Sequence, residues 1–145
     1  CVFIMLVLIY RNFLKAMIAL SPTVIGMIAM FGVMGFLDIK LNIFNMGVFP
    51  TVLGIGIDNA IHIYHRYDEE GRDGMLRALR TTGMAACVTT LTTMFGFAGM
   101  LSAGNKGLVS LGLVACIGLL CCLIASLTFF PALIQLLDNR KRLAD

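Results

Sequence analysis

Asp58 is a carboxylate in the middle of an apolar stretch that runs from about residue 43 to residue 63. An ionised aspartate at bilayer depth costs roughly 2.5 to 3.5 kcal/mol on insertion scales, so such residues usually face protein or a water-filled path and serve a function. Burial favours the neutral form of a carboxyl group. We therefore predict that Asp58 takes up and releases a proton. The alternative is a protonated aspartate that hydrogen-bonds a neighbouring helix.

Small residues precede this carboxylate. Gly54 and Gly56 add no side-chain bulk, so a neighbouring helix or a file of water can approach the backbone next to Asp58. Pro50 leaves the carbonyl of Met46 without its intrahelical hydrogen bond and can kink the helix. The segment is thus predicted to be thin and locally soft near the carboxylate, a property that transporters use.

His62 lies one helical turn after Asp58, and His65 follows one turn later. The three side chains could form a stripe that leads protons toward the cytosol, or the histidines could simply mark where the helix leaves the membrane. No metal site is expected, because two histidines and one carboxylate are too few ligands and no H-E-x-x-H motif is present. No nucleophile and base pair is visible either, so we expect no enzyme and no cofactor, only H+ as a coupling ion.

A second polar cluster, the threonine-rich run from residue 89 to residue 93, interrupts a later apolar stretch. One helical face there is small and hydroxylated, and it comprises Thr82, Ala86, Thr89, Thr93 and Gly96. We predict that this face, together with Thr92, packs on the Asp58 helix and supports its carboxyl group. Alternatively, the threonines bond carbonyls of their own helix and serve as small packing residues.

The composition places these residues in a membrane protein. Hydrophobic residues make up 59% and charged residues 13% of the 145 residues, with a mean hydropathy of +0.95, whereas soluble domains have about 25% charged residues. The sequence predicts an all-α membrane fold, a polytopic transmembrane helical bundle in a single domain. Its expected elements are a partial first span at about 1–10, full spans at about 16–37, 43–64, 82–102 and 107–137, and a cytosolic amphipathic helix at about 67–80.

Loop charges predict the orientation of this bundle. Of the Lys and Arg residues, Lys40 and Lys106 fall on one side and the other nine on the opposite side. This distribution predicts a multi-pass protein of the inner (cytoplasmic) membrane with a cytosolic C terminus. No aromatic-rich basic patch is present, so nucleic acid is not an expected partner. The half-length first span predicts that the chain is a fragment of a longer protein.

The motifs together resemble a known superfamily. The runs LNIFN at 41–45, GIGIDNAIHIYHRY at 54–67, TTLTTMFGF at 89–97 and FPAL at 130–133 are similar to membrane segments of the RND superfamily, in its MmpL-like and hopanoid-transporter branch. The resemblance covers nearly the whole chain and fits the C-terminal transmembrane half. It implies that Asp58 belongs to a proton relay with counterparts in the other half of the protein.

One departure from that resemblance concerns Asn59. Exporters of mycolate lipids usually have tyrosine after the relay aspartate, whereas this chain has asparagine, which could donate a hydrogen bond to a carboxylate on a facing helix. The resemblance implies part of an RND-type exporter of lipids or hydrophobic molecules, driven by the proton-motive force, with Asp58 and Asn59 in the relay. Expected partners are membrane lipids, a lipid-like substrate and the missing N-terminal half; a homo-oligomer stays open. The alternative is a sterol- or lipid-sensing or scaffold domain without transport.

Overall fold

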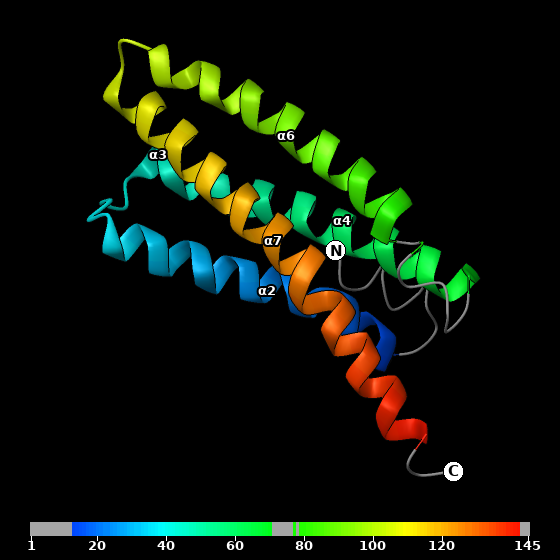
Figure 1. The fold of residues 1–145 in the computed structure, drawn as a ribbon. Helices are drawn as coiled ribbons and strands as arrows, with labels where there is room; N and C mark the ends of the chain where they lie inside the picture. The colour runs from blue at the N-terminus through cyan, green and yellow to red at the C-terminus, as the bar shows by residue number, and fades with distance from the viewer. Residues whose placement is uncertain (1–12, 71–76, 78, 143–145) are drawn as a thin grey trace.

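The computed structural model describes residues 13–70, 77 and 79–142, and Figure 1 shows its helices. These are α2 (Phe13–Phe36), α3 (Ile43–Met46), α4 (Val48–Glu70), the π-helical turn η2 (Leu79–Gly83), α6 (Met84–Ala98), the 3-10 turn η3 (Gly99–Ser102) and α7 (Lys106–Arg142). No strand occurs in these described ranges. The predicted partial span at 1–10 lies outside them, as do residues 71–76 and 78 of the predicted surface helix.

Four helical stretches are long and apolar enough to cross a membrane, by length and composition. They are Met17–Phe36, Ile43–Tyr67, Leu79–Ser102 and Lys106–Leu136, and each overlaps one of the full spans expected from the sequence. The prediction of an all-α membrane bundle is confirmed. The second span runs on as α4 to Glu70, so residues 67–70 continue this helix instead of starting a separate one.

The long helix α7 crosses the middle of the bundle in Figure 1, with α2 on one side and α6 on the other. It packs along α2 and also contacts α3, α4 and α6. α4 packs against both α2 and α7, whereas α6 packs mainly on α7. The described part is therefore a group of three closely packed helices, α2, α4 and α7, with α6 attached along α7.

The main hydrophobic core lies between α2, α4 and α7. Its buried side chains are Met30, Met34, Val48, Val52, Val114, Ala115, Leu119 and Cys122. A second cluster, formed by Ile63, Tyr64, Phe130 and Ile134, joins the later part of α4 to α7. Because α4 contributes to both clusters, its rotation about its own axis is restrained near both ends, and this determines which of its side chains face away from the core.

The span predicted as one helix at 43–64 is divided near its start. α3 ends at Met46, Gly47 forms a turn, and α4 begins at Val48. Pro50 therefore lies in the first turn of α4, where a missing N–H group costs little because these groups have no intrahelical partner. The break in the helix precedes Pro50, and α4 then continues without interruption.

α2 ends in a Schellman-type turn. The N–H of Ile39 donates to the carbonyl of Met34 at 3.0 Å, and the N–H of Asp38 donates to the carbonyl of Gly35 at 3.4 Å. Asp38 has a positive φ of 51°. Glycine is the usual residue at this position, because it has no Cβ to clash in the left-handed region.

We expect Asp38→Gly to raise the thermal unfolding temperature of the detergent-solubilised protein. The substitution removes backbone strain of about 1 kcal/mol from the end of α2. Asp38→Ala is the matched control, because alanine must adopt the same positive φ and offers no local hydrogen bond, so it should lower the unfolding temperature. A glycine variant no more stable than the alanine variant would contradict this account of the turn.

Candidate functional site

Asp58 lies on the side of α4 that is turned away from the main core. Its side chain is 71% exposed, and its Oδ1 lies 3.4 Å from Nε2 of His62, which is 66% exposed. The i,i+4 spacing of a helix places the two side chains next to each other. A carboxylate and an imidazole in contact can pass a proton between them, because each group can donate or accept one.

A cavity of about 510 Å³ opens beside this pair, between α4 and the beginning of the third span. α4 supplies its charged and amide groups, whereas η2 and α6 supply hydroxyl groups and alanines. The lining residues are Asp58, Asn59, His62, Arg66, Thr81, Thr82, Ala85, Ala86 and Thr89. A water molecule occupies about 30 Å³ in the liquid, so the cavity is large enough for several waters next to the carboxylate.

Asn59, the next residue of α4, lines the same cavity but is buried and reaches α6. Its Nδ2 donates a hydrogen bond of 3.0 Å to Oγ1 of Thr90 on α6, and the two residues are only 6% and 1% exposed. The sequence analysis predicted that Asn59 could donate a hydrogen bond to a carboxylate on a facing helix, whereas the acceptor in the structure is the hydroxyl group of Thr90, which was not singled out. One feature of the sequence points to Thr90: it lies one helical turn after the small residue Ala86, so the two share a helix face. These are the two buried residues of α6.

The other threonines of the run bond their own helix. Thr89, Thr92 and Thr93 each donate to a backbone carbonyl of α6 within one turn, at distances of 2.8 to 3.1 Å. Thr89 also lines the cavity. The structure therefore brings Thr89 close to the Asp58 region, while Thr92 and Thr93 follow further along α6.

The glycines of the predicted site have different surroundings. A Cβ at Gly56 would lie 3.0 Å from Cγ2 of Thr23 and 3.3 Å from Sγ of Cys122, so α2 and α7 both approach α4 closely there. No neighbouring atom lies within 4 Å of a Cβ built at Gly54 or Gly96. Gly56 thus serves helix packing, whereas the other two leave space on the outer surfaces of α4 and α6.

The third span is the least covered part of the described bundle. Only 11% of its most apolar window is buried, compared with 33% to 44% for the other three spans. Large apolar side chains on α6 are exposed, namely Met84, Val88, Leu91 and Phe95. Together with the Asp58 side of α4, α6 forms an open flank of the bundle.

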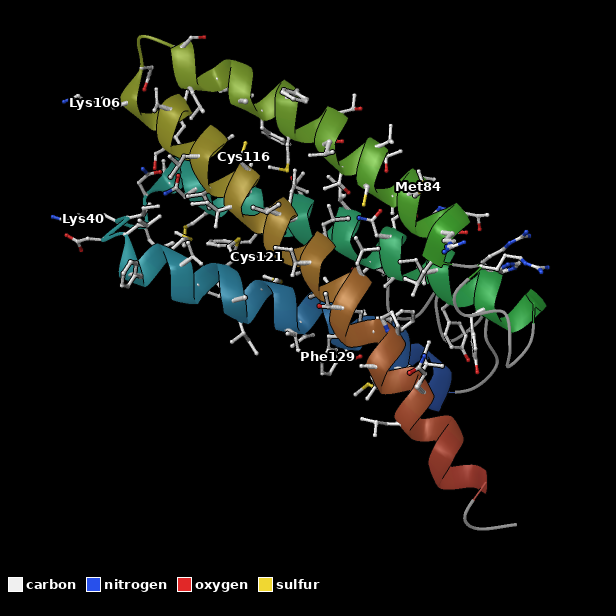
Figure 2. The ribbon with its side chains drawn as sticks, viewed as in Figure 1. Lys40, Met84, Lys106, Cys116, Cys121 and Phe129 are labelled. Atoms are coloured by element: carbon white, nitrogen blue, oxygen red, sulfur yellow. The ribbon has the colours of Figure 1, made fainter. Side chains whose placement is uncertain are left out.

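Charged residues are separated along the bundle. Figure 2 shows Lys40, in the loop after α2, and Lys106, at the start of α7, at the same end. Arg66 and Arg80 belong to the end of α4 and to η2, at the opposite end of these helices. This is the two-sided distribution on which the predicted orientation depends.

No three His, Cys, Asp or Glu side chains come together as a metal site within the described ranges. What the structure does bring together is a carboxylate–imidazole pair, a cavity with hydroxyl groups in its wall and a buried amide–hydroxyl contact, all on membrane spans. Fold and site thus define a multi-pass helical membrane protein with an ionisable residue inside a span, an arrangement typical of ion-coupled transport.

Comparisons with known proteins agree with this class. The model of the MMPL family matches residues 1–145, and the chain belongs to the MMPL family. The resemblance predicted from the sequence motifs is therefore confirmed.

Two relatives are informative. The chain is 40% identical over 139 residues to a membrane protein of Methanocaldococcus jannaschii, a match that covers 92% of this chain and 36% of that protein. It is 28% identical over 103 residues to the hopanoid transporter HpnN of Burkholderia multivorans, covering 67% of this chain and 12% of the transporter. The chain thus spans about a third of the first relative and about an eighth of the second.

Proposed function

We propose that this chain is part of a proton-driven RND-type exporter of lipids or other hydrophobic molecules, in which Asp58 carries the coupling proton. The observation that carries the proposal is the contact between Asp58 and His62 beside a cavity of about 510 Å³ that lies between two membrane spans and has ionisable, amide and hydroxyl groups in its wall. Membership of the MMPL family and the similarity to a hopanoid transporter support a hydrophobic substrate.

Protonation of Asp58 would change the free energy of placing this face of α4 in polar or apolar surroundings. The ionised carboxylate needs water or a polar partner, whereas the neutral acid can face apolar groups at much lower cost. Proton binding therefore shifts the equilibrium between two arrangements of the helices. Each charge that crosses the membrane supplies about 2.3 kcal/mol per 100 mV to drive this change.

The neighbouring residues have supporting roles in this relay. His62 and the cavity provide a path from Asp58 toward the Arg66 end of α4. Asn59 is the second polar residue of the relay, and Thr89 presents a hydroxyl group on the opposite wall. Thr92 and Thr93 add two further hydroxyl groups along α6, after Thr89.

The membrane orientation follows from the loop charges. The positive-inside rule puts the Arg66 end of the bundle and the C terminus in the cytosol, with the chain in the inner membrane. Exposing the open flank, formed by α6 and the Asp58 side of α4, to lipid acyl chains would cost free energy, because a carboxylate lies on this flank. We therefore infer that the other half of the transporter, carrying the relay counterparts, covers this flank.

The function is tested with the full-length protein in liposomes under an imposed pH gradient, using a fluorescent lipid-like substrate. We expect substrate to move while the gradient lasts and to stop when a protonophore collapses it. Lipid binding that does not depend on the gradient, without net movement, would favour the sensor or scaffold function instead.

A further inference from the structure

A buried hydrogen bond connects the two walls of the cavity. Asn59 lines the cavity from α4, and its Nδ2 donates to Oγ1 of Thr90 on α6 at 3.0 Å. The bond is nearly inaccessible to solvent, since the two residues are 6% and 1% exposed. Thr90 thus accepts a bond from another helix, whereas Thr89, Thr92 and Thr93 donate to carbonyls of α6.

Among the described residues, close packing joins α4 to the third span mainly at η2, the turn that leads into α6. The backbone of α6 packs closely on α7, whereas α4 packs on α2, on α7 and on the turn η2. The separation of α4 and α6 sets the width of the cavity, because the two helices form its opposite walls. The Asn59–Thr90 bond therefore adds a direct link between α4 and α6, one turn beyond Ala86 in the cavity wall, to the packing of η2 on α4.

The same bond restrains the rotation of α4. Asp58 and Asn59 are consecutive, so on a helix their side chains point about 100° apart, one outward and one into the bundle. A rotation of α4 by about 20° would move a side chain about 5 Å from the helix axis by roughly 2 Å. A hydrogen bond of 3.0 Å does not survive such a displacement.

A rotation of α4 that turned Asp58 toward or away from the cavity would therefore break this bond. The titratable and charged groups that line the cavity with Asp58 are His62 and Arg66, both on α4, and the described residues of η2 and α6 add only hydroxyl groups and alanines to its wall. The orientation of Asp58 relative to α6 is thus set by the packing of α4 in the core together with the Asn59–Thr90 bond, and not by an opposing charge among the described lining residues.

We propose that Asn59 and Thr90 are positioning residues whose hydrogen bond holds α4 in the rotation that exposes Asp58 to the cavity, and that this bond breaks when α4 turns during proton transfer. The inference rests on the proposed transport function. The inference assigns Asn59 a role within the described helices, in which it links α4 to α6.

The test uses Thr90→Val in the full-length protein, because valine has the shape of threonine but no hydroxyl group. Thr90→Ser restores the hydroxyl group, and Thr128→Val is the matched control, since Thr128 is an exposed residue of α7 whose hydroxyl bonds its own helix at Ile124. Two properties are measured: deuterium exchange of the α6 amides, and the pH at which gradient-driven transport is half-maximal.

We expect Thr90→Val to speed exchange in α6 by about threefold to tenfold, the range of interhelical hydrogen bonds in membranes, and to shift the half-maximal pH. Thr90→Ser should restore both properties, and Thr128→Val should change neither. Unchanged exchange in Thr90→Val would overturn the positioning role, whatever the transport result. Faster exchange with an unshifted half-maximal pH would overturn the link to Asp58, whereas transport that survives Asp58→Asn would overturn the proposed function itself.

Discussion

The Asp58→Asn variant of the full-length protein is expected to insert and fold normally but to lose gradient-driven accumulation of substrate. Asparagine has the size of aspartate but cannot take up a proton, so the variant cannot couple proton movement to helix rearrangement. One coupled proton at 100 mV supplies about 2.3 kcal/mol, which sustains a concentration ratio of about 50-fold. In the variant this ratio should fall to about 1.

The matched control for this experiment is Asp38→Asn, which makes the same chemical change at the end of α2. Asp38 lies in a turn with a positive φ, and asparagine is among the few residues that tolerate this conformation. This control should accumulate substrate as the parent does. Equal losses in both variants would show that the effect of Asp58→Asn reflects net charge or folding and not proton transfer.

Gly26→Ala should cause the largest loss of stability among the Gly→Ala substitutions in α2. A Cβ at Gly26 would lie 2.7 Å from both Cα and Sγ of Cys122, so the backbones of α2 and α7 must move apart to admit it. Overpacking of this kind costs about 1 to 3 kcal/mol. We expect a clear drop in the thermal unfolding temperature of the detergent-solubilised protein.

Gly32→Ala provides the comparison on the same helix. No neighbouring atom lies within 4 Å of a Cβ at Gly32, so alanine meets open space and gains up to about 1 kcal/mol in helix propensity. The two variants should therefore shift the unfolding temperature in opposite directions. If Gly26→Ala is as stable as Gly32→Ala, the close approach of α2 and α7 is not present in the protein.

The spans could be predicted from the sequence because length and hydropathy determine them. A stretch such as 16–37 is long enough to cross a bilayer and has no competing structure in lipid, so its helical state follows from composition. The division of the second span at Gly47 was not predicted. The apolar run continues through that turn, and hydropathy does not distinguish a helix break from a helix.

The site was predicted only in part, because side-chain partners depend on how helices rotate against each other. The i,i+4 spacing of Asp58 and His62 belongs to one helix, and their contact could therefore be expected. The partner of Asn59 is on another helix, and four threonines of α6 were equally good candidates by residue type. The packing of α6 on α7 determines that Thr90 is the threonine that faces Asn59. The local sequence does not indicate this packing, except through the small residue Ala86 one turn earlier.

The central claim, that Asp58 carries the coupling proton, is tested most directly by recording the lumenal pH of liposomes that contain the full-length protein and an outward substrate gradient, without an imposed pH gradient. The account predicts that substrate flow through the parent changes the lumenal pH and that the Asp58→Asn variant produces no change. A pH change of parental size in Asp58→Asn liposomes would contradict it.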